Sequence, residues 1–189
     1  TEIDCIVQSF ADATLNPELW IPALKMMSSS MGSASSALEL ADVNTGEAVM
    51  KCTFPLDGNL VDLYEERIYH INPRISRARR APVGAIMDDR TLLVDGDPHM
   101  AEFMDWLRET PHRYVKGSKL FQAGGQEIYF GSYFAESQGP PESWHHDALE
   151  QIVPHLVNYI RAARVLSGGK LNNELIKLEA LNSDRPFAL

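Results

Sequence analysis

The chain has 189 residues, a length sufficient for one domain with a hydrophobic core and a helical extension. Hydrophobic residues make up 44% and charged residues 23%, which is close to the average for globular proteins. The net charge is −9, so the domain repels the phosphate backbone, which argues against binding nucleic acid through its overall field. Cys5 and Cys52 fit no metal or redox spacing, and no signal peptide or apolar run of the ~20 residues that span a bilayer is present, which favours a cytoplasmic setting.

The first part of the chain predicts two helices followed by a β-hairpin. Apolar residues at helical spacing indicate an amphipathic helix over residues 2–13. Asn16-Pro17-Glu18 then opens a second helix, because a capping side chain, a proline in the first turn and an early acid favour a helix start. Residues 37–42 and 47–54 read as strands, and Asn44-Thr45-Gly46 between them is typical of a hairpin turn.

The middle of the chain predicts two further helices on either side of an arginine-rich segment. Residues 59–70 form the first, and Asn72-Pro73 ends it because the residue before a proline is driven out of helical geometry. Four arginines then fall within seven residues, and in an acidic domain they indicate a solvated face or local salt bridges. These are Arg74, Arg77, Arg79 and Arg80. Residues 85–87 predict a short extended piece, and residues 99–109 predict the second helix.

The clearest strands of the chain are residues 114–123 and 127–134, joined by a Gly124-Gly125 hairpin turn. A long amphipathic segment follows over residues 142–182, and Pro154 within it predicts a kink because it removes one helical hydrogen bond. Hairpins outnumber crossovers in this order. The predicted fold class is therefore α+β, a central and mainly antiparallel sheet with helices packed on it, plus a long C-terminal helix, as in GAF- and PAS-like sensory domains.

The end of the long segment carries a leucine series that predicts self-association. The segment exceeds the length of an ordinary globular helix, and a protruding apolar stripe is most simply covered by a second copy of itself. We therefore expect a domain over residues 1–166, a helical extension over residues 167–189, and a homodimer. The leucines of the series are Leu171, Leu175, Leu178 and Leu181.

Motifs for catalysis or metal binding are not found. The sequence has no glycine-rich phosphate loop, no G-x-S-x-G and no HExxH. His145, His146 and Asp147 are adjacent, so on a helix their side chains diverge by about 100° and do not converge on one ion. We expect neither an enzyme nor a metal or cofactor site, and no membrane partner.

Aromatic and polar residues in the middle of the chain form the candidate binding site. They would converge if the central helices covered the sheet, and an apolar cavity with a few polar groups is what a small molecule requires. An ordinary aromatic core would gather the same residues. The candidate ligand-binding residues are Tyr64, Tyr69, Asn72, Trp106, Tyr129 and Tyr133, with Tyr114 beside them.

We expect the ligand to be a small apolar or aromatic molecule. It would lie between the strands of residues 114–123 and 127–134 and the helices of residues 59–70 and 99–109. These helices would share one face of the sheet with the first half of the long helix, so that binding could shift that helix.

Three segments resemble the LuxR-type bacterial transcriptional regulators. Their central pattern Y-x-x-x-Y-x-x-x-D-P-R…R-x-P-x-G…D is similar to YEERIYHINPRISRARRAPVGAIMDD of this chain. The end of their sensory domain is similar to PPESWHHDALEQIVPHLVNYIRAARVL, and its start to DCIVQSFADATLNPELWIPALKMM. The likeness extends over most of the chain.

The resemblance implies a sensory domain that precedes a helix-turn-helix domain. No helix-turn-helix pattern follows the long segment, so this chain would contact DNA only through a domain that it lacks. Quorum-sensing members hold an acyl-homoserine lactone with a Trp, a Tyr and an Asp; Tyr64 corresponds to the Tyr, whereas Leu60 and Asn72 stand at the other two positions. The ligand is therefore left open. The alternative is a dimerisation or interaction module of the same fold that binds no ligand.

Overall fold

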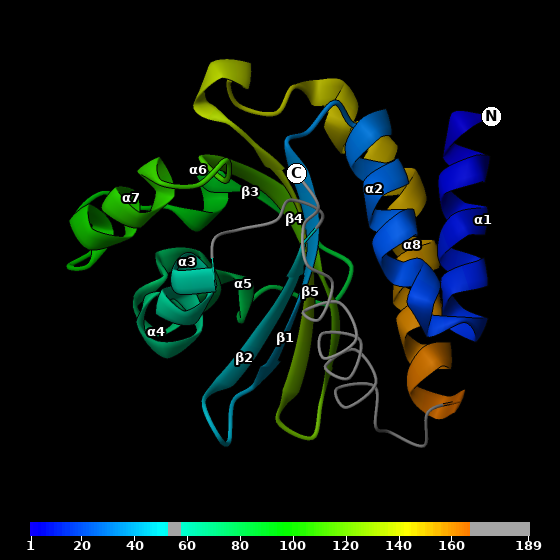
Figure 1. The fold of residues 1–189 in the computed structure, drawn as a ribbon, viewed down its shortest axis with the longest axis horizontal. Coiled ribbons are helices and arrows are strands. Elements are labelled where there is room, and N and C mark those ends of the chain that lie inside the picture. Colours follow the sequence, from blue (N-terminus) through cyan, green and yellow to red (C-terminus); the bar gives the residue numbers. More distant parts are fainter. Residues whose placement is uncertain (53–57, 167–189) are drawn as a thin grey trace, which may run out of the picture.

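The structure is a computed structural model that describes residues 1–52 and 58–166 (Figure 1). A five-stranded sheet lies between two layers of helices, in the strand order β2-β1-β5-β4-β3. All four neighbouring strand pairs are antiparallel, which confirms the predicted α+β class. The strands are β1 (Ser35–Asp42), β2 (Glu47–Cys52), β3 (Ile86–Asp88), β4 (Tyr114–Ala123) and β5 (Gln126–Phe134).

Both predicted hairpins are present, and turn chemistry explains them. Gly124 and Gly125 between β4 and β5 have φ of 61° and 82°, a region that glycine adopts without a steric penalty. Gly46, with φ of 77°, closes the turn between β1 and β2. β1 of the first hairpin pairs with β5 of the second, so the central strand and one of its neighbours come from distant parts of the sequence.

The first helical layer comprises the N-terminal helices and the long helix. It contains α1 (Glu2–Leu15), α2 (Trp20–Ser30) and α8 (Ser143–Leu166). Large apolar side chains of the sheet face this layer, and with the helices they form the main core of the described residues. α8 continues through Pro154, which lies on its exposed side, to Leu166.

The second helical layer covers the other face of the sheet. The predicted helix of residues 59–70 is interrupted by a π-helical turn at Tyr64–Ile68, and two short helices, α5 and α6, were not predicted from the sequence. The helices of this layer are α3 (Gly58–Leu63), α4 (Tyr69–Ile71), α5 (Pro73–Ala78), α6 (Asp89–Leu92) and α7 (Met100–Arg108).

The expected placement of the long helix beside these central helices is wrong, because α8 packs on the opposite face of the sheet (Figure 1). The alternation of side chains along β1 is the physical reason. Leu38 and Leu40 point toward the layer that contains α8, whereas Ala37 and Ala41 point toward the second layer. The bulky apolar face of the sheet therefore takes the long apolar stripe, and the face with small residues takes the shorter helices.

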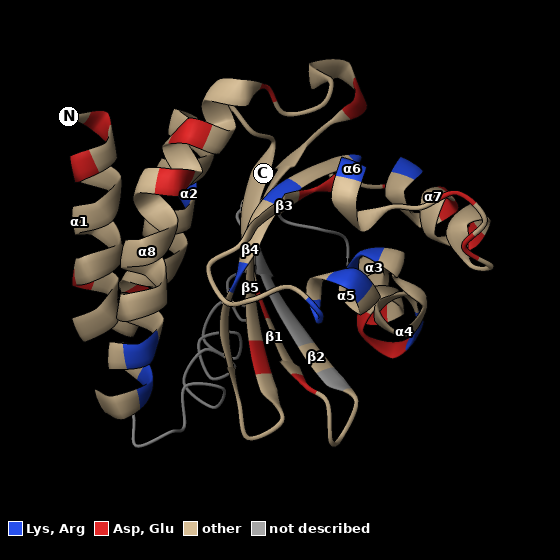
Figure 2. Cartoon of the chain, turned by 180° about the vertical axis from the view of Figure 1, so that it is seen from behind, with Lys and Arg blue, Asp and Glu red and all other residues tan. Residues whose placement is uncertain are grey.

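The arginine-rich segment forms local salt bridges, as predicted. Arg74 pairs with Asp89, Arg77 with Asp97, and Arg79 with Glu127. Figure 2 shows acidic and basic positions interspersed over the second layer. Arg74 is buried and thus not part of a solvated face.

Several predictions fall on residues that the structure does not describe. The leucine series beyond residue 166 and the end of the second predicted strand, residues 53–54, lie outside the described ranges. None of the described helices is both long enough and apolar enough to cross a lipid bilayer.

Candidate functional site

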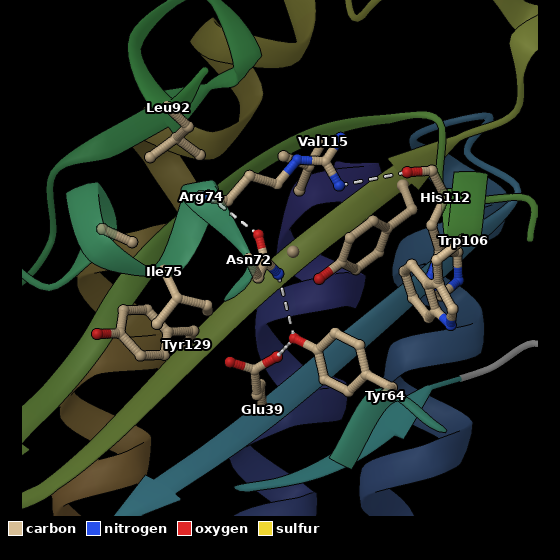
Figure 3. Close-up of a pocket in the computed structure, with 13 residues that line it drawn as sticks. Glu39, Tyr64, Asn72, Arg74, Ile75, Leu92, Trp106, His112, Val115 and Tyr129 are labelled. Atoms are coloured by element: carbon tan, nitrogen blue, oxygen red, sulfur yellow. Dashed lines mark hydrogen bonds between the residues drawn. The ribbon is translucent and has the colours of Figure 1, made fainter. Parts of the chain in front are cut away.

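A cavity of about 60 Å³ lies between the sheet and the second helical layer (Figure 3). This volume holds a few water molecules, since a cavity needs about 10–15 Å³ to hold one. The lining residues come from β1, β4, β5, the π-helical turn and the helices α5, α6 and α7, with their connections. They are Glu39, Tyr64, Asn72, Arg74, Ile75, Ala78, Leu92, Trp106, His112, Val115, Tyr129, Gly131 and Tyr133.

Five of the six predicted ligand-binding residues line this cavity, namely Tyr64, Asn72, Trp106, Tyr129 and Tyr133. Tyr69 lines a neighbouring hollow instead, and its hydroxyl accepts a hydrogen bond from Arg79 Nη2 at 3.2 Å. Tyr114 also lies elsewhere, with the Arg113 guanidinium 4.7 Å from its ring centroid. The structure thus brings the predicted group together, and ligand binding by it stays a prediction.

Aromatic rings form much of the cavity wall. The Tyr64 and Trp106 ring centroids are 5.0 Å apart, and Trp106 stacks in turn on Phe103 at 6.3 Å. Across the cavity, Tyr133 stacks on the imidazole of His112 at 4.3 Å with an interplanar angle of 24°. Such contacts fix the rings in place and leave their faces as apolar binding surface.

Small residues in the sheet make room for the cavity. Gly131 of β5 is the register partner of Ala37 on β1 and of Gly117 on β4, so a row of small residues crosses the central strands. A Cβ added to Gly131 would lie 2.9–3.0 Å from the ring and hydroxyl of Tyr133. The Tyr133 ring therefore lies directly over Gly131, where a larger residue would displace it.

Glu39 places a carboxyl group in this apolar setting. Tyr64 donates a hydrogen bond from its hydroxyl to Glu39 Oε2, and Asn72 Nδ2 donates to the Tyr64 oxygen at 3.4 Å. Glu39 Oε1 is buried and has no hydrogen-bond partner among the described residues. Burial raises the pKa of Glu39 to about 7, and the nearby Glu127 adds to the increase, although the Tyr64 hydrogen bond and Arg79 oppose it.

His112 contributes a second buried polar group. Its Nε2 is 2.8 Å from Ser35 Oγ, whereas its Nδ1 has no partner among the described residues. Burial lowers the pKa of His112 to about 3, with a further decrease from the Arg74 charge, so the imidazole is neutral at pH 7.

Arg74 holds the frame of the site. Its guanidinium makes a bidentate pair with Asp89, at 2.7 and 2.9 Å, and donates to the backbone carbonyls of His112 at 3.3 Å and Arg113 at 2.9 Å. Asp89 in turn accepts from the Val115 backbone N–H at 3.1 Å. This network ties α5 and α6 to the start of β4, which suits Arg74 to positioning the walls.

Glu127 on β5 is a second buried carboxylate on the same face, and its partners are internal. Arg79 Nε donates to Glu127 Oε2 at 3.0 Å, and the Tyr129 hydroxyl donates to the same oxygen at 2.8 Å. Two carboxylates thus lie near each other on neighbouring strands, one paired with a cation and the other, Glu39, hydrogen-bonded through one oxygen. Within the described ranges, no group of three or more metal-ligating side chains converges.

Besides Arg74, the polar residues of the cavity that sequence reasoning missed are Glu39 and His112. For Glu39 the sequence gives little signal, because a glutamate between Leu38 and Leu40 is also the pattern of a strand with one solvent-exposed face. For His112 the sequence offers none, since it follows Pro111 in a connection whose burial only the packed structure shows.

Comparison with known proteins rests on structure. No protein-family model and no curated protein matches the sequence. The fold is similar to that of CepR2 from Burkholderia cenocepacia, described as an N-acylhomoserine lactone-dependent LuxR-family transcription factor. The TM-score is 0.63 and the identity 15%, over 85% of this chain and 94% of that one. For the ligand-binding domain of VqsR from Pseudomonas aeruginosa, the TM-score is 0.66 and the identity 9%, over 84% and 93% of the chains. The chain therefore has the fold of the ligand-binding domains of LuxR-family regulators.

Proposed function

We propose that this chain is the ligand-sensing regulatory domain of a LuxR-type bacterial transcriptional regulator. The cavity carries the proposal, because it combines aromatic walls with two buried polar atoms, Glu39 Oε1 and His112 Nδ1, that have no partner among the described residues. Apolar pockets with a few convergent polar groups are the usual form of small-molecule sites. The likeness to CepR2 and to the VqsR ligand-binding domain supports this function at the level of the fold.

The same atoms favour a sensor over an interaction module that binds no ligand. A module with a filled core should satisfy its buried polar groups internally, as folded proteins do for the great majority of such groups. Glu39 is only 4% exposed and yet offers an unused carboxyl oxygen. A ligand that fills the cavity would supply the missing partner.

The proposed signal route runs across the sheet. Glu39 lies between Leu38 and Leu40 on β1, and these two leucines pack in the core that includes α8. Consecutive residues of a strand point to opposite faces, so a shift of β1 caused by a ligand would move both leucines against the first layer. The ligand achieves this only by favouring one arrangement, with a differential free energy of roughly 1–3 kcal/mol.

The remaining parts of the proposal concern partners. We infer a cytoplasmic homodimer that uses the leucines beyond residue 166, in a regulator that contacts DNA through a helix-turn-helix domain.

A thermal-shift screen with acyl-homoserine lactones, aromatic acids, amines and nucleotides tests the function, because a specific ligand raises the melting temperature by mass action. Trp106→Phe is expected to weaken the response to any hit, since Trp106 lines the cavity. Trp144→Phe is the matched control, because Trp144 is 46% exposed and lies at the start of α8. A hit that responds equally to both variants would place the site elsewhere, and a screen without hits would favour the interaction module.

A further inference from the structure

We propose that the ligand of this cavity carries a protonated amine, which pairs with Glu39 Oε1 beside a group of aromatic rings. This inference rests on the proposed function and specifies the chemical class of the molecule sensed.

Only one of the two carboxyl oxygens of Glu39 has a hydrogen-bond partner among the described residues. Its Oε2 accepts from the Tyr64 hydroxyl, while its Oε1 is buried without a partner in the described part of the chain. Figure 3 shows this second oxygen directed away from Tyr64. An ionised carboxylate only accepts hydrogen bonds, and an unmet buried acceptor is strongly unfavourable. Above pH 7, where Glu39 is mostly ionised, the missing group at Oε1 is therefore a hydrogen-bond donor.

The neighbouring cationic side chains of the described chain donate their hydrogen bonds to other groups. Arg74 donates to Asp89 and to two backbone carbonyls. Arg79 donates to Glu127 and to the Tyr69 hydroxyl. Lys119 Nζ donates to the Arg79 carbonyl at 2.8 Å. The donor for Glu39 is thus expected from the ligand.

The aromatic surroundings of Glu39 favour a cationic donor over a neutral one. Tyr64 and Trp106 line the cavity with Glu39, and Tyr129 is its register partner on β5 (Figure 3). The negative face of an aromatic ring attracts a cation within about 6 Å, most strongly when water is excluded. A buried carboxylate beside such rings is a suitable site for an organic ammonium group. The volume of about 60 Å³ favours a small one.

The test measures binding of n-butylamine and benzylamine to the 189-residue chain at pH 8, by thermal shift and calorimetry. Comparison compounds are n-butanol and benzyl alcohol, which are neutral, and butyrate and benzoate, which are anionic, all at equal ionic strength. We expect the amines to bind at least about tenfold more tightly than the matched alcohols. Glu39→Gln should weaken amine binding about 10- to 100-fold and alcohol binding by a smaller factor. Glu66→Gln, an exposed control, should change neither.

A pH series on the unmodified chain gives a second readout that needs no variant. Binding of the amines should strengthen between pH 5 and pH 7 as Glu39 ionises, whereas binding of the alcohols should not. The ionisable groups that act on Glu39 are Tyr64 of the π-helical turn, Glu127 of β5 and Arg79, which follows the end of α5; Tyr69 of α4 and Tyr129 of β5 also interact with it. Glu39→Gln should abolish the pH dependence.

The outcomes separate the two proposals. If alcohols or acids bind as tightly as amines, or if Glu39→Gln leaves amine affinity unchanged, the amine inference is wrong. The sensor function then still stands, provided that some compound binds in a manner sensitive to Trp106→Phe. If no compound of any class binds in that manner, both proposals fail.

Discussion

At the scale of single residues, Glu39 determines the electrostatics of the cavity. Burial raises its pKa from 4.5 to about 7, so the folded chain holds this proton more tightly than the unfolded chain. The stability that results is fully present below pH 4.5 and is lost as the pH rises through 7. Above pH 8 the ionised side chain therefore costs roughly 3 kcal/mol in the absence of a ligand.

Replacing Glu39 by glutamine should remove this pH dependence. We expect the free energy of unfolding of Glu39→Gln to exceed that of the unmodified chain by under about 1 kcal/mol at pH 5 and by roughly 3 kcal/mol at pH 8. The reason is that the neutral amide has no charge to bury. Urea unfolding at the two pH values measures the difference. Glu66→Gln, on the exposed side of the π-helical turn, should show no such trend. An equal gain at both pH values would mean that Glu39 is not the titrating group.

The glycines of the small-residue row provide a second prediction at this scale. A Cβ at Gly131 meets the Tyr133 side chain at 2.9–3.0 Å, whereas a Cβ at Gly117 meets the backbone oxygen of Phe130 at 2.1 Å. A side chain can move and a central strand cannot, so Gly131→Ala should cost about 1–3 kcal/mol and Gly117→Ala more. Chemical unfolding of both variants checks the order. Gly131→Ala should also weaken ligand binding, because the displaced Tyr133 ring would enter the cavity, and the reverse order of stabilities would contradict this geometry.

At the scale of elements, Asn72 joins two helices to the cavity. It caps α5 by accepting from the Arg74 backbone N–H at 3.0 Å, and the fixed φ of Pro73 suits the first helical position. Its amide nitrogen meanwhile donates to Tyr64 in the preceding π-helical turn. Turns of the π type occur often at functional sites, and here the turn contains the tyrosine that contacts Glu39.

Two substitutions of Asn72 separate its capping role from its place in the cavity. Asn72→Ala removes the cap and the hydrogen bond to Tyr64. We therefore expect it to lower the free energy of unfolding by about 1–2 kcal/mol, and by a similar amount at pH 5 and pH 8. Asn72→Asp keeps the cap but brings a second carboxylate toward Tyr64 and Glu39. Its loss should therefore be greater at pH 8 than at pH 5, because like charges repel once both ionise. Unfolding curves at both pH values test this, and a pH-independent loss in Asn72→Asp would show that the two carboxylates do not interact.

The sequence predicted the elements with strong patterns and missed the short ones. Helix α1, both hairpins and the described part of the long helix follow from apolar spacing and turn residues. Helices α5 and α6 have six and four residues, too few for a periodic pattern, and begin at caps formed by Asn72 and Asp88. The aromatic part of the site was predictable because such residues converge in a core. The carboxylate was not, since Glu39 gains its role from cross-strand neighbours.

At the scale of the whole molecule, the spacing of apolar residues could not predict which helices cover which face of the sheet. Seven consecutive residues of β1, from Ser35 to Ala41, are buried, so the strand shows no exposed face from which to assign the helices. Spacing identifies which residues of α8 are buried but not which face of the sheet they cover. The structure assigns α8 to the face opposite the cavity, so any effect of a ligand on α8 must pass through the sheet.

The last prediction concerns the boundary between the domain and its extension. The core that includes α1, α2 and α8 contains Ala163 near the end of the described helix, so residues 1–166 hold the buried side chains that this core is built from. We expect a chain of residues 1–166 to fold with a melting temperature within a few degrees of the full chain, since this range holds that core. We also expect it to be a monomer under conditions in which the 189-residue chain is a dimer, because Leu171, Leu175, Leu178 and Leu181 would be missing.

Light scattering of both chains at high micromolar concentration measures the two masses, and Leu175→Asp with Leu178→Asp in the full chain is the matched control. That double variant should also be a monomer, because two charges within an apolar stripe oppose its burial against a second copy. A dimer of residues 1–166 would instead place the contact within the described domain, where Leu15 and Val165 are exposed at 71% and 80%. A monomeric full chain would exclude self-association through the leucines.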